Sequence, residues 1–155
     1  MTKTLGGLAL LLLTSAGTAY ASEDATAVGA LERCLMTAGA PQVTTDYACG
    51  EAAYALCETG GALRADCLTP LREALWLDVD AVLATMPQRP PEALGLSRKD
   101  YRALKRGLRA GLGWPGCPKG VPEARCDYMT ALERWVEARA LQQTLTAVTV
   151  EGRER

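Results

Sequence analysis

Six cysteines are the residues of this chain with the most readily defined chemistry, because thiols act as nucleophiles, bind metals or form disulfides. No two of them have the Cys-x-x-Cys spacing of thioredoxin-type redox sites or the short Cys-x₂₋₄-Cys spacing of zinc sites. The chain has no histidine, which excludes Ser-His and Cys-His nucleophile pairs and His-ligated zinc. The spacings therefore favour disulfides, formed by Cys34, Cys49, Cys57, Cys67, Cys117 and Cys126.

The first 21 residues, MTKTLGGLALLLLTSAGTAYA, decide the compartment in which these thiols are expected to lie. Lys3 precedes an apolar run at 5–13, and Ala19-Tyr20-Ala21 has the small-x-small pattern that a signal peptidase accepts. We interpret residues 1–21 as a cleaved signal peptide; an uncleaved anchor or an amphipathic first helix are the alternatives. The protein is then periplasmic or secreted, where cysteines pair and persist as disulfides.

Composition limits the classes of partner. The formal net charge is −1 over 155 residues, so the chain has no overall field that would attract nucleic acid or an anionic membrane. No apolar stretch approaches the roughly 20 residues of a stable membrane span. We expect one domain over 22–148, followed by a frayed tail at 149–155.

Apolar residues at helical spacing predict a small all-α bundle of about five helices, stapled by disulfides, and no strand. The clearest stripe consists of Leu68, Leu71, Leu75, Val79, Val82 and Met86. Two features leave alternatives open: Thr44 or Thr45 caps the second helix, and Pro70 either begins the third helix or kinks one that starts near Ala62. The expected helices are 26–39, 46–59, the third ending near 86, 97–112 and 122–148.

The fourth of these helices is expected to be amphipathic. Ser97 and Asp100 form a start that resembles a capping box. Its buried side is predicted to consist of Tyr101, Leu104, Leu108 and Leu112. Its opposite side, a candidate surface for anions, carries Arg98, Arg102, Lys105, Arg106 and Arg109.

Helix geometry restricts which cysteines can pair. In a helix over 46–58, Cys49 and Cys57 lie about 12 Å apart along the axis, whereas a disulfide requires Cα atoms within about 7 Å. Each must therefore reach another segment. Proximity along the chain favours Cys34–Cys49, Cys57–Cys67 and Cys117–Cys126, although other connectivities remain open.

Several of these residues together resemble the LprI-like lysozyme-inhibitor family of exported bacterial proteins. The resemblance rests on Cys34-Leu35, "CGEAAYALC" from Cys49, Cys67-Leu68, Glu73 with "WLD" at 76–78, and "CDYMTALERWVEARAL" from Cys126. The chain departs from the family at 111–117, where "GLGWPGC" replaces a Trp followed by an Arg-Asp pair. The resemblance implies binding to a lysozyme or another cell-wall hydrolase.

The candidate binding surface for such a partner is acidic and aromatic. Glu73, Asp78 and Asp80 lie within two turns of the third helix and would attract a basic lysozyme. Trp114 stands in a predicted loop, where it anchors a partner or covers the disulfide at Cys117. Carboxylates beside a leucine stripe more often form the solvated side of a helix than an acid–base pair.

The sequence therefore predicts an exported envelope protein that binds another protein and is not an enzyme, with no cofactor and no metal. Lysozyme inhibition is the leading hypothesis. The alternative is a non-catalytic accessory module that binds anionic cell-envelope material through the basic helix. Trp76 and Trp135, beside the apolar stripes, are expected in the core.

Overall fold

The computed structural model describes residues 26–59, 61–110 and 117–151, and in these ranges the chain is an α-helical bundle. Helix α1 (Ala27–Ala38) and α2 (Val43–Ala55) are followed by a hairpin of β1 (Glu58–Thr59) and β2 (Ala62–Leu63). The remaining elements are α3 (Ala65–Thr85), the short 3₁₀ helix η2 (Glu92–Leu94), α4 (Arg98–Ala110) and α5 (Glu123–Glu151). The all-α prediction is confirmed; the prediction of no strand is wrong for the two-residue strands.

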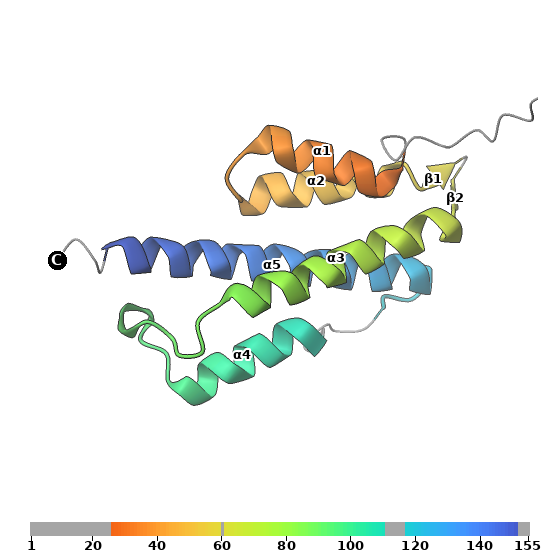
Figure 1. Ribbon diagram of the computed structural model, residues 1–155. Helices are drawn as coiled ribbons and strands as arrows, with labels where there is room; N and C mark the ends of the chain where they lie inside the picture. Colours follow the sequence, from red (N-terminus) through yellow and green to blue (C-terminus); the bar gives the residue numbers. More distant parts are fainter. Residues whose placement is uncertain (1–25, 60, 111–116, 152–155) are drawn as a thin grey trace, which may run out of the picture.

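Helices α3 and α5 pack side by side along the middle of the bundle (Figure 1). The α1–α2 hairpin covers one side of this pair, and α4 packs on the other side (Figure 1). The long α5 contacts α2, α3 and α4. The two central helices therefore bring residues from both halves of the chain together.

The core follows the apolar stripe of α3. All six stripe residues are buried, with exposed fractions of at most 7%, and they share one core cluster with Leu132, Trp135 and Val136 of α5. Gly50 of α2 lets α5 approach closely, because a Cβ there would contact the Leu132 side chain. The predicted stripe and the predicted burial of Trp135 are thus confirmed.

The starts of two helices differ from the predictions. Helix α2 begins at Val43 and Gln42 provides no side-chain cap, so capping by Thr44 or Thr45 is wrong. Pro70 lies inside α3, which begins upstream of it at Ala65. Pro70 therefore does not begin the helix, and the alternative of a start upstream of Pro70 is correct. The start is at Ala65 rather than Ala62 because Ala62 pairs with Thr59 in the β1–β2 hairpin.

The other differences lie on α4 and at the end of α5. Leu104 is 41% exposed because it lines an open groove between α4 and α5, so its predicted burial is wrong. Tyr101 and Leu108 are buried as predicted, and Leu112 is outside the described residues. Of the tail predicted to be frayed, 149–151 belong to α5, which continues to Glu151, and 152–155 are outside the described residues.

Disulfides join the helices in the predicted pattern. Cys34–Cys49 links α1 to α2 with a Cα separation of 5.6 Å, and Cys57–Cys67 closes the hairpin between α2 and α3 at 5.4 Å. Cys117–Cys126 closes the loop before α5 at 5.6 Å. Each such bond typically contributes about 2–4 kcal/mol to a small domain.

Candidate functional site

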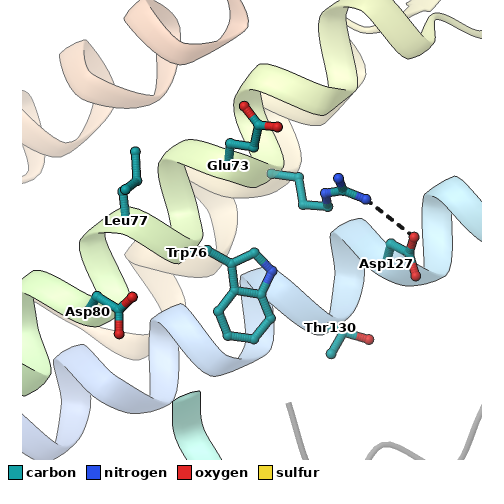
Figure 2. A pocket seen from close by; sticks show the side chains of 7 residues that line it. Glu73, Trp76, Leu77, Asp80, Asp127 and Thr130 are labelled. Carbon is teal, nitrogen blue, oxygen red and sulfur yellow. Dashed lines mark hydrogen bonds and ion pairs between the residues drawn. The ribbon is translucent and has the colours of Figure 1, made fainter. Parts of the chain in front are cut away.

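A groove of about 510 Å³ between α3 and α5 is the candidate binding site (Figure 2). Its volume is within the range of about 300–1,000 Å³ typical of ligand pockets. Helix α3 provides Arg72, Glu73, Trp76, Leu77 and Asp80, and α5 provides Asp127 and Thr130.

Trp76 stands at the centre of the groove. Its indole projects from α3 toward α5, with Asp80 at one end and Asp127 at the other (Figure 2). Trp76 packs against the core cluster but is only partly buried, so the prediction that it lies in the core is confirmed only in part. Leu77, next to it on the outer side of α3, is 72% exposed. The groove thus combines aromatic and aliphatic surface.

Charged pairs stand at both ends of this apolar surface. Asp80 Oδ1 accepts a hydrogen bond from Arg109 Nε of α4 at 2.7 Å. Asp127 pairs with Arg72 at 3.3 Å. Glu73 has no ion-pair partner within 4.0 Å among the residues that the structure describes, so it is the free carboxylate of the groove.

Asp78, predicted to join Glu73 and Asp80 in one acidic surface, serves a different purpose. Its carboxylate accepts a hydrogen bond from Trp135 Nε1 at 2.6 Å. It also lies 3.8 Å from Arg139 Nη1. The Asp78 side chain is 42% exposed, but it contacts α5 and does not line the groove, so its predicted place in one surface with Glu73 and Asp80 is wrong.

The same region contains a buried charge pair that the sequence patterns did not predict. Asp46 of α2 is only 2% exposed, and it accepts hydrogen bonds from Arg139 Nε at 2.8 Å and Nη2 at 3.3 Å. The Arg139 guanidinium lies 4.9 Å from the centre of the Trp135 ring. This arrangement satisfies a charge that would be costly to bury alone, and it joins α2, α3 and α5.

The groove residues Arg72, Asp127 and Thr130 were not predicted either. Their types carry no motif, and Arg72 and Asp127 are 55 positions apart. The available signal was weak: Arg72 and Trp76 are one turn apart on one side of a helix, as are Asp127 and Thr130. Which of these two sides would meet depends on how α3 packs against α5.

The basic side of α4 does not form one free surface. Arg109 is paired with Asp80. The Nζ of Lys105 lies 5.7 Å from the centre of the Tyr101 ring, and burial, together with the charge of Arg109, lowers the Lys105 pKa. The remaining three cations are exposed: Arg98, Arg102 and Arg106.

Ser97 begins α4 as predicted. Its Oγ accepts a hydrogen bond from the Asp100 backbone N–H at 3.1 Å and donates one to the Asp100 carboxylate at 2.6 Å. In the helix that follows this cap, Tyr101 and Leu108 are buried in the bundle and Arg98, Arg102 and Arg106 are exposed. Trp114, the predicted loop anchor, is outside the described residues.

Within the described ranges, no group of three or more Cys, Asp or Glu side chains is arranged to hold a metal ion. None of the helices described is long and apolar enough to cross a membrane. The comparisons with known proteins found no matching family model, no matching curated protein and no matching solved structure.

Proposed function

We propose that this protein is an exported bacterial envelope protein that binds another protein through the groove between α3 and α5. The leading candidate partner is a lysozyme or another cell-wall hydrolase. The observation that carries the proposal is the juxtaposition of the partly exposed Trp76 and the 72% exposed Leu77 in a groove with acidic ends. Exposed aromatic and aliphatic side chains in a hollow are typical anchors of protein interfaces.

The charge of the groove supports a basic partner. Three carboxylates and one arginine line it, and a negative surface speeds and orients the approach of a positively charged protein. Lysozymes are generally basic, and the resemblance to the LprI-like family points to the same class. Helix α4 also carries arginines, one of which, Arg109, pairs with Asp80 at the end of the groove, and their charge limits how a basic partner approaches.

The three disulfides support export. Disulfides persist in oxidising compartments outside the cytoplasm, and the chain forms them from all of its cysteines. We propose that the signal peptide over 1–21 directs the protein to the periplasm or the medium. There the protein acts by binding rather than by catalysis.

A lysis assay tests the proposal. The purified exported protein is mixed with a lysozyme, and the turbidity of a bacterial cell-wall suspension is followed at low and at physiological salt. We expect slower lysis, with the inhibition weakened by salt and by Leu77→Ser, which removes exposed apolar surface. Undiminished lysis at a large molar excess of the protein would reject lysozyme as the partner.

A second candidate function rests on α4. Arg98, Arg102 and Arg106 are exposed, and none has an ion-pair partner among the described residues. Such a row of cations suits anionic cell-envelope material. Arg102→Ala with Arg106→Ala is expected to reduce the retention of the protein on anionic wall polymer and its salt dependence. If the retention on anionic wall polymer changes neither with the two substitutions nor with the salt concentration, this function is rejected.

A further inference from the structure

We infer that the group recognised by the α3–α5 groove is an arginine side chain of the partner, and that it is preferred over lysine. The inference rests on the proposed function, since it assumes that the groove is the docking surface. Its starting point is the position of two carboxylates relative to the partly exposed indole of Trp76. A planar guanidinium both stacks on an aromatic ring and binds carboxylates, whereas an ammonium is a point charge.

Helix geometry places both carboxylates on the same side of Trp76. At about 100° per residue, Asp80 lies about 40° and Glu73 about 60° around α3 from Trp76, one turn after it and one turn before it. Leu77 follows on the same outer side, at about 100°. All four side chains line the same groove, with the indole directed toward α5 and with Glu73 and Leu77 directed away from it (Figure 2). A guanidinium that enters between them can therefore stack on the indole and pair with one of the carboxylates.

The bundle already contains an arginine held in the same way. Arg139 lies 4.9 Å from the centre of the Trp135 ring, and the Asp46 carboxylate accepts two hydrogen bonds from its guanidinium. There a tryptophan and acidic residues from neighbouring helices surround a guanidinium. Trp76 and Glu73 present the same two chemical groups at the surface, with Glu73 free of an ion pair within the part of the chain that the structure describes.

Arg109 gives the inference a distinctive consequence. It pairs with Asp80, and its side chain is 64% exposed, so it adds a positive charge and occupies one groove carboxylate. Removing it leaves Asp80 available to the incoming guanidinium. Arg109→Ala is therefore expected to tighten the binding of a cationic ligand, whereas the loss of an arginine would weaken the binding of a glycan or another anionic ligand.

The test compares two decapeptides of equal charge, one alternating glycine with arginine and the other glycine with lysine, titrated calorimetrically into the purified protein. We expect the arginine peptide to bind about fivefold more tightly. Trp76→Leu should abolish that preference while retaining apolar bulk, and Glu73→Gln should weaken both peptides. Glu32→Gln, an exposed change of the same charge on α1, is the matched control.

Equal affinities, no binding of either peptide, or an arginine preference that survives Trp76→Leu would overturn the inference; circular dichroism verifies that each variant is folded. The peptide titrations and the lysis assay can fail independently of each other. Arginine-specific binding without inhibition of lysis leaves the inference standing and rejects lysozyme as the partner. Inhibition of lysis that is unaffected by Trp76→Leu and Glu73→Gln retains the function but moves it to another surface.

Discussion

Removal of the Asp46 carboxylate is expected to destabilise the whole bundle, because this group holds Arg139 between three helices. The Asp46 side chain is 3% exposed and the Arg139 side chain 16%. Asp46→Ala leaves a largely buried guanidinium without its two closest acceptors, and breaking a buried pair in this way costs about 3–5 kcal/mol. Asp78 remains 3.8 Å from Arg139, so we expect the lower end, about 3 kcal/mol, and a fall in Tm of roughly 10 °C.

The free energy of unfolding is measured by urea titration with the disulfides intact, followed by far-ultraviolet circular dichroism. Arg64→Ala is the control, because it breaks the Arg64–Asp66 pair, whose side chains are 51% and 75% exposed. Exposed pairs contribute little, so this variant should unfold near the wild-type midpoint. If Asp46→Ala unfolds at the same urea concentration as Arg64→Ala, the reasoning about buried charge is refuted.

A double variant separates the loss of the pair from the exposure of a lone charge. Replacing Asp46 by Leu and Arg139 by Met removes both charges and leaves apolar side chains in their place. Such replacements of buried pairs are often nearly neutral. We therefore expect the double variant to be more stable than Asp46→Ala. A double variant that is as unstable as the single one would indicate that packing around Arg139, rather than its charge, stabilises the bundle.

Three further predictions concern the helices and the disulfides. Gly50→Ala should destabilise the protein, because an overpacking cost of about 1–3 kcal/mol against Leu132 exceeds a helix-propensity gain of about 1 kcal/mol. Gly107→Ala should stabilise it, because the space around Gly107 is open. Urea midpoints of the two variants that move in the same direction would contradict this. Burial raises the pKa of Tyr128 above its ordinary value of 10.0. The contribution of the neutral Tyr128 hydroxyl to stability is therefore complete below pH 10 and is lost as the pH rises above 10, where the tyrosine of the unfolded chain ionises first. Tyr128→Phe should make the urea midpoint decline less steeply above pH 10, and an unchanged slope would count against the assignment. Limited reductant should open Cys117–Cys126 before the other two disulfides, because Cys117 is exposed and thiolate attack requires access; mass spectrometry after alkylation identifies the first pair opened, and a core pair in that place would contradict the prediction.

Interactions between residues close in the chain could be predicted from the sequence. The disulfide partners are separated by only 15, 10 and 9 positions, and the rise of a helix by itself excludes a Cys49–Cys57 bond. The buried stripe of α3 and the Ser97 cap of α4 are equally local, because each depends on spacings of three or four residues. Amphipathic periodicity of this kind is determined by the sequence itself, independently of how the helices later pack.

The candidate site and the charge cluster required the tertiary structure. The Asp46–Arg139 pair joins residues 93 positions apart, and the two ends of the groove join residues 55 and 29 positions apart. Periodicity indicates which side of a helix is apolar, but it does not determine which helix covers that side or at what register. Helical periodicity places Asp78 about 160° around α3 from Asp80, but only the packing shows that Asp78 meets Trp135 of α5 while Asp80 lines the groove. The packing of α3 against α5 decides between the two carboxylates, since neighbours on opposite sides of a helix meet different partners.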